Sequence, residues 1–366
     1  MNRALVPFRE QHTQFQISPE YARISMAAAI ELGLKPGRFL RDCVCGCVNL
    51  LQNYPEGCYA NCSYCGLARE RPGVPEGNSF IRVAWPLYPM ALIAERIAER
   101  EHLSGVGRVC LSQVQDHRSN DDLLSMVALI RSAVPTVPVA ALVNATTMSL
   151  MWLERLRSAG VSNIGIGLDA ASKRIFEKAR GRETCGPHTW EQHIEIMRLA
   201  RGVFGPMNVN CHVIVGLGET DMELVDLFAW LKQEEVAAYL FSFNPEPGTA
   251  MQHIPRQPIT RHRRIQLVKH LVEEFDIAPS AVSYDPGGFI ASVDVDRELI
   301  DRAIESGTPF MTDGCPDRTG VMACNRPFGS YRPGEEFRDY PFVPGESDLE
   351  VIRVQLNLGE ICPAYA

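Results

Sequence analysis

The sequence predicts an α/β fold, a partial or full (β/α) barrel with cysteine-bearing N- and C-terminal extensions. Three observations predict it. From about residue 87 onward, short apolar stretches alternate with helical patterns of 10–15 residues, which indicates βαβ units and a parallel sheet. Polar or acidic residues follow several predicted strands, and in such barrels the chemistry sits at that end of the strands. Cysteines gather before the first unit and after the last one.

The predicted elements follow in chain order. A capped amphipathic helix is expected over 18–36, and a cysteine-rich loop follows it. Helices are expected over 87–101, 121–133, 149–159, 188–204, 222–233 and 260–275, and strands over 108–114, 137–144, 163–169, 209–216 and 237–244. The Gly-, Pro- and Arg-rich tail from about Pro309 is expected to be irregular. These patterns divide the chain into an N-terminal extension (1–57), a barrel (58–308) and a C-terminal extension (309–366).

Size and composition indicate a globular enzyme. The chain has 366 residues, 46% hydrophobic and 22% charged, enough for one large barrel with extensions or two smaller domains. A net charge of −8 argues against a nucleic-acid interface, which needs a basic face. The sequence has no run of 18 apolar residues and no secretory pattern, so we expect a cytoplasmic protein without a membrane span. Its twelve cysteines are then expected to be metal ligands more often than disulfides.

The most specific motif is Cys58-x3-Cys62-x2-Cys65. It supplies three thiolates to a four-iron cluster, whereas an electron-transfer cluster normally has four cysteine ligands. The fourth iron is then open to another molecule. The alternatives are a zinc knuckle or a disulfide loop, but zinc needs a fourth ligand at finger spacing and none follows Cys65.

The motif resembles the signature of the radical S-adenosylmethionine (SAM) superfamily. The resemblance implies a barrel of the radical SAM type, a [4Fe–4S] cluster whose open iron holds SAM, and an electron donor such as ferredoxin or flavodoxin. One electron then cleaves SAM to a 5'-deoxyadenosyl radical, which abstracts hydrogen from an unactivated carbon. That step needs no side-chain acid or base, so no catalytic residue is assigned beyond the cofactors.

The resemblance also implies SAM contacts. Tyr64 matches an aromatic residue near the adenine, and Ser112 and Gln113 end a strand where many members carry Gly-Gly-Glu. Asp169 resembles the acceptor for the ribose hydroxyls, although it could instead cap the helix starting near Ser172.

Two arginines and a glycine-rich strand end complete the implied SAM site. Arg180 and Arg182 are candidates for pairing with the SAM carboxylate, or are solvated surface residues. Gly216, Gly218 and Glu219 resemble the G-x-I-x-G-x-x-E strand beneath the adenine, with a histidine in place of the first glycine.

Asn244 opens an Asn-Pro-Glu-Pro-Gly-Thr segment that resembles biotin synthase and its relatives, a branch that includes lipoyl synthases, mutases and lyases. This resemblance covers roughly residues 40–310.

A second cysteine set consists of Cys43, Cys45, Cys47, Cys315 and Cys324. Alternate residues of an extended segment point the same way, so the first three could face one metal site. We expect them to hold a second [4Fe–4S] cluster together with the C-terminal pair. Unligated thiols and structural zinc are the alternatives.

The other cysteines are expected to be unremarkable. Cys110, Cys185 and Cys211 lie singly and are expected to be structural, and Cys362 is expected to be free at a frayed C-terminus. His117, His188, His212 and His253 are lone histidines, for which structural roles are expected.

Together these features resemble the two-component lipoyl synthases, in which two biotin-synthase-like proteins share the work. Ser330 echoes a serine ligand of ordinary lipoyl synthase and is a candidate ligand. The resemblance implies a sulfurtransferase that converts octanoyl to lipoyl groups, with a lipoyl carrier protein or a paralogous radical SAM protein as partner. The alternatives are a radical SAM mutase, lyase or methylase without sulfur insertion, and a non-catalytic iron–sulfur electron carrier.

Overall fold

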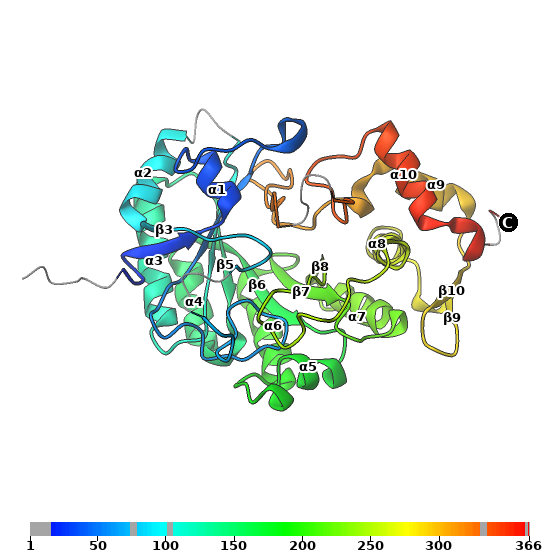
Figure 1. Ribbon diagram of the computed structural model, residues 1–366, viewed down its shortest axis with the longest axis horizontal. Coiled ribbons are helices and arrows are strands. Elements are labelled where there is room, and N and C mark those ends of the chain that lie inside the picture. The colour runs from blue at the N-terminus through cyan, green and yellow to red at the C-terminus, as the bar shows by residue number, and fades with distance from the viewer. Residues whose placement is uncertain (1–15, 74–78, 101–104, 330–334, 363–364, 366) are drawn as a thin grey trace, which may run out of the picture.

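The computed structural model describes residues 16–73, 79–100, 105–329, 335–362 and 365 (Figure 1). Its centre is an eight-stranded sheet in the order β3-β1-β2-β4-β5-β6-β7-β8. The strands are β1 (Tyr21–Ile24), β2 (Cys47–Leu51), β3 (Leu87–Pro89), β4 (Arg108–Ser112), β5 (Val139–Val143), β6 (Val161–Asp169), β7 (Val209–Val215) and β8 (Ala237–Ser242).

Six of these strands, β2 and β4 to β8, run parallel. Strand β1 is antiparallel to both β2 and β3, and the sheet ends at β3 and β8 without closing. The predicted α/β fold is therefore confirmed, in its partial-barrel form. Because β2 is the first parallel strand, the sheet begins before residue 58.

Helices cover the outer face of the sheet (Figure 1). They are α2 (Met90–Arg100), α3 (Ser119–Ala133), α4 (Leu150–Ser158), α5 (Lys173–Ala179), α6 (Trp190–Phe204), α7 (Asp221–Gln233) and α8 (Ile259–Glu274). Outward-facing strand residues such as Val109 and Leu111 are fully buried in one core with Val127 and Ile130 of α3. Each such side chain contributes about 1.5–3 kcal/mol of burial free energy. The inner face instead carries polar residues.

The C-terminal part forms a small helical layer beside α8. It contains β9 (Val282–Tyr284), β10 (Ile290–Val293), α9 (Arg297–Ser306) and α10 (Glu346–Leu356). Arg41, from the N-terminal extension, donates two hydrogen bonds to Asp348 of α10, at 2.6 and 2.9 Å. Gly46 packs so closely on Ala323 that a Cβ there would lie 2.5 Å from the Ala323 carbonyl oxygen. The two extensions therefore meet over the strands (Figure 1).

Most predicted strands and helices of the barrel are confirmed, but three regions differ. The helix expected over 18–36 is β1 followed by the short α1 (Met26–Glu31), because residues 21–24 pair with two strands and Ser25 caps the helix. The first residues of the helix expected over 87–101 form β3. The tail is not wholly irregular, since α10 packs on α8 there. In each case pairing with distant residues overrides a local pattern.

None of the helices in the described ranges has both the length and the apolar character needed to cross a bilayer.

Arg263 of α8 is fully buried and binds the C-terminal extension (309–366) through hydrogen bonds. Its guanidinium donates to the carbonyl oxygens of Phe337 and Arg338, to Gln355 and to Gln266.

We predict that Arg263→Met lowers the free energy of unfolding by about 2–4 kcal/mol, because buried acceptors lose their donor. Chemical denaturation measures this. The control Arg157→Met, on the exposed face of α4, should change it by less than about 0.5 kcal/mol. Equal effects of the two substitutions would contradict the assigned role.

Candidate functional site

The Cys58, Cys62 and Cys65 loop follows β2 at the carboxyl edge of the sheet. All three cysteines line one cavity of about 230 Å³ that opens to solvent. The backbone N–H of Gln115 donates to Cys58 Sγ at 3.4 Å, which ties the loop to the end of β4. Burial raises the pKa of all three thiols, that of Cys62 to about 11. A bound cation is therefore needed to hold them as thiolates at neutral pH.

No group of three or more histidine, cysteine, aspartate or glutamate side chains in the described ranges is arranged to hold a metal ion as it stands.

Residues from the ends of four further strands line the same cavity. They are Gln113 after β4, Asn144 after β5, Asp169 at the end of β6 and Asn244 after β8. Gln113 accepts from the Asn144 backbone at 2.9 Å and donates to Asn120 at 2.8 Å, so its amide aligns the neighbouring strand end. The parallel sheet thus brings five of the predicted SAM contacts to one place, counting Tyr64 and Arg180 with Gln113, Asp169 and Asn244.

Asp169 is held in an unusual conformation. Its φ is +64°, in the left-handed region, where aspartate is tolerated better than most residues, and the β6–β7 register shifts beside it. The Tyr64 hydroxyl and the Arg180 guanidinium both donate to its carboxylate, and Arg180 also donates to Tyr64 at 3.1 Å. Ser172, not Asp169, is the N-cap residue of α5. The carboxylate therefore faces the cavity rather than capping a helix.

Unpaired polar atoms around the cavity test whether SAM fits. Among the described residues, the buried atoms Gln115 Oε1, Asn144 Oδ1, Asn244 Oδ1 and Arg180 Nε have no hydrogen-bond partner. Such buried atoms in native proteins call for a partner. Three acceptors and one cationic donor suit a ligand with an ammonium group, hydroxyls and a carboxylate, which SAM carries. The site fits the molecule.

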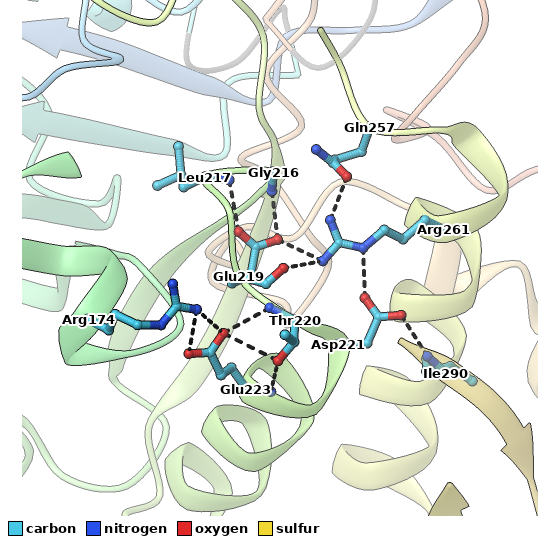
Figure 2. Close-up of polar contacts among 10 residues, drawn as sticks. All are labelled: Arg174, Gly216, Leu217, Glu219, Thr220, Asp221, Glu223, Gln257, Arg261 and Ile290. Carbon is cyan, nitrogen blue, oxygen red and sulfur yellow. Dashed lines mark hydrogen bonds and ion pairs between the residues drawn. The ribbon is translucent and has the colours of Figure 1, made fainter. Parts of the chain in front are cut away.

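Glu219 does not line the cavity. Figure 2 shows its carboxylate accepting from the backbone N–H groups of Gly216 and Leu217, each at 2.8 Å, and from Arg261 at 3.0 Å. Arg261 in turn donates to Asp221 at 2.7 Å. Burial raises the pKa of Glu219, with Arg261 acting against it. Its observed contacts shape the loop between β7 and α7.

The glycines beside Glu219 allow that loop. Gly216 and Gly218 have φ of +115° and +107°, which disfavour any side chain. A Cβ at Gly216 would also lie 2.8 Å from the Gln257 side chain.

Two other candidates lie elsewhere. Ser112 faces a second, deeper cavity, and Arg182 is exposed in the turn between α5 and α6.

The second cavity, of about 100 Å³, lies between the inner faces of the strands and the C-terminal loop. Cys110 of β4 lines it together with Cys315 and Cys324. Cys47 at the start of β2 hydrogen-bonds Cys324, and this bond, helped by Arg326, lowers the pKa of Cys324 to about 6. Four thiols therefore meet here. Cys110 was expected to be structural, and no sequence pattern separates it from a core residue.

The remaining cysteines have other surroundings. Cys45 packs in the hydrophobic core and donates to the Cys47 carbonyl oxygen at 3.3 Å, and Cys43 accepts from Asn325 at 3.5 Å. Cys211 belongs to the same core, and Cys185 is exposed. Cys362 is buried in the core, so the prediction that this residue lies at a frayed C-terminus is wrong. Ser330 lies outside the described residues.

The two cavities adjoin each other. Both are lined by Phe80, Ile81, Leu142, His212 and Phe241. Burial, together with Arg326, lowers the pKa of His212 to about 3, so this imidazole is neutral at physiological pH.

Residues 53–231 match the family model of the radical SAM superfamily. This part of the chain is a radical SAM domain. The chain is similar to biotin synthases: 26% identical over 198 residues to that of Halorhodospira halophila (53% of this chain, 56% of the relative), and 25% over 170 residues to that of Parabacteroides distasonis (46% and 50%). The biotin synthase of Persephonella marina is 23% identical over 264 residues (72% and 71%). Among solved structures, methylornithine synthase (PylB) aligns with a TM-score of 0.49 at 13% identity (92% and 86%).

The chain spans about half the length of the first two relatives. Cys58, Cys62 and Cys65 would supply the thiolates to the [4Fe–4S] cluster that the radical SAM match implies, with SAM in the same cavity. The matched region covers these cysteines and Asp169 but neither Cys47 nor Cys324.

We predict that Asp169→Asn weakens SAM binding about tenfold or more, a loss of about 1.4 kcal/mol, because the charged acceptor disappears and Arg180 loses its partner. Equilibrium dialysis of the reconstituted radical SAM protein measures this. Asp121→Asn is the control, since that carboxylate is 73% exposed. Unchanged affinity in Asp169→Asn would rule the residue out as a SAM contact.

Proposed function

We propose that this radical SAM enzyme is a sulfurtransferase that inserts sulfur into an unactivated C–H bond of an octanoyl chain, as in lipoyl biosynthesis. The observation that carries the proposal is the second cavity, where four thiols meet beside the SAM cavity. A reaction that only abstracts hydrogen has no use for a second thiol-lined site so close to the first.

Cys47, Cys110, Cys315 and Cys324 would hold a second iron–sulfur cluster. Their sulfurs come from two strands and from the C-terminal loop, which the N-terminal extension holds in place. When bound, SAM and the first cluster supply a hydrogen-abstracting radical, and the second cluster supplies sulfur. In the balance, SAM would take up one electron from the donor and release methionine, and the hydrogen of the broken C–H bond would leave in 5'-deoxyadenosine. The C–S bond would form to a sulfide of the second cluster, whose irons would take up one electron.

The residues shared by the cavities suit an acyl chain. Phe80, Ile81, Leu142 and Phe241 provide apolar surface across the junction. A methylene chain passing them would lie with one part near the SAM contacts and another near Cys110 and Cys324. Neutral His212 adds no charge to this junction, so it does not oppose an apolar substrate.

The partners belong to the same proposal. An octanoyl group amide-linked to a lysine would arrive on a lipoyl carrier protein, a ferredoxin or flavodoxin would deliver electrons, and a paralogous radical SAM protein would share the two sulfur insertions. A second candidate is a radical SAM mutase, lyase or methylase without sulfur insertion.

The decisive experiment is anaerobic reconstitution followed by reaction with SAM, dithionite and an octanoyl-lysyl peptide. Mass spectrometry should find 5'-deoxyadenosine together with a thiolated peptide. Deoxyadenosine without thiolation would favour the second candidate, and neither product would support an electron carrier.

In the same assay we predict that Cys315→Ala/Cys324→Ala keeps 5'-deoxyadenosine formation but loses thiolation, because the SAM cavity does not include either residue. Cys185→Ala, an exposed cysteine, should keep both activities. If both activities disappear in the double variant, these cysteines support the fold instead.

Iron content tests the ligand set. The wild-type protein should bind about eight irons and Cys110→Ser markedly fewer, because two four-iron clusters are proposed and Cys110 holds one of them. Cys211→Ser is the matched control, since that thiol sits on β7 within the hydrophobic core. Equal iron content in the two variants would exclude Cys110 from the site.

A further inference from the structure

Two asparagines on the inner face of the sheet aim their amides at cysteine sulfurs. Asn49 of β2 donates from Nδ2 to Cys47 Sγ at 3.4 Å and to Cys324 Sγ at 3.6 Å. Asn210 of β7 donates from Nδ2 to Cys315 Sγ at 3.6 Å. Three strands separate β2 from β7 in the sheet, so the two amides approach the thiols from different sides.

The surroundings of Asn210 show that burying this amide costs folding free energy. The residue is 3% exposed, and its Oδ1 has no partner among the described residues. A buried polar atom left unpaired is unfavourable. On the neighbouring strand, a Cβ at Gly165 would lie 2.9 Å from that Oδ1, so the glycine leaves the asparagine its space. Packing alone would favour an apolar residue here.

The sulfur contacts account for the amides. Hydrogen bonds to cluster sulfurs are among the features that set the reduction potential of iron–sulfur clusters. An N–H donor stabilises negative charge on a thiolate, and the reduced state carries more negative charge than the oxidised one. Donors at three of the four thiols therefore favour reduction of a metal centre held there.

We propose that Asn49 and Asn210 are positioning residues that orient Cys47, Cys315 and Cys324 by N–H···S hydrogen bonds and raise the reduction potential of the second cluster. The inference rests on the proposed second cluster. It has a chemical use, because sulfur donation to a carbon-centred radical leaves one electron to be taken up, and these hydrogen bonds favour its uptake.

The test isolates the second site. In a Cys58→Ala/Cys62→Ala/Cys65→Ala background, the protein is reconstituted anaerobically and its cluster is titrated with dithionite, the reduced signal being followed by electron paramagnetic resonance. Asn49→Leu and Asn210→Leu should each shift the midpoint potential to more negative values. The double variant should shift it by about the sum, since the amides contact different sulfurs.

Asn144→Leu is the matched control. It removes the same kind of side chain, but from the SAM cavity. Among the described residues Asn144 has no contact with the second set of cysteines, so the midpoint potential of the second cluster should stay unchanged. If Asn49→Leu and Asn210→Leu lose iron while Asn144→Leu keeps it and all three melt at the same temperature, direct contact with the sulfurs is also supported.

Unchanged potentials in Asn49→Leu and Asn210→Leu, at full iron content, would overturn this inference and leave the proposed function standing. A background protein that binds no iron at all would instead overturn the second cluster itself. The two failures are thus distinguishable.

Discussion

The parallel register of six strands is the constraint on which both cavities depend. Because the strands run in one direction, their carboxyl ends share one edge, and Asp169 and Asn244 meet the cysteine loop there. The same register aligns residues in layers deeper in the sheet. It pairs Asn49 with Cys110, which places an amide beside a thiol. It also pairs Gly165 with Asn210, so the glycine leaves room for the asparagine side chain. The parallel register therefore places the polar residues of the SAM cavity at the carboxyl edge of the sheet and the thiols of the second cavity one layer deeper.

The second cavity also requires residues from both the N-terminal and the C-terminal extension. Strands alone contribute Cys47 and Cys110, whereas Cys315 and Cys324 come from a loop more than two hundred residues later. Asn325 links the two segments by accepting from Gly46 N at 3.3 Å and donating to the Val44 carbonyl oxygen at 2.7 Å. These bonds fix the loop against the start of β2. A metal centre at this point would tie both extensions to the sheet.

The sequence was informative where a local pattern has one structural meaning. The C-x3-C-x2-C loop and the acidic end of β6 both lie where the alternation of strands and helices put them. Prediction from the sequence was wrong where pairing with distant residues determines the secondary structure. Residues 21–24 are a strand because β2 and β3 flank them. Cys110 looked like a core residue because a strand buried on both faces shows no alternation that separates its inner side from its outer side.

Charge explains why the thiols have to be considered together with a metal. Burial raises the pKa of Cys58, Cys62 and Cys65, and that of Cys45 and Cys110, so these groups are neutral in the protein alone at pH 7. Iron bound by such thiols would therefore displace their protons, and its binding would strengthen as the pH rises toward those pKa values. Cys324 differs, because its hydrogen bond with Cys47 and the nearby Arg326 lower its pKa. A metal that binds Cys324 would therefore displace its proton more easily than the protons of the other thiols.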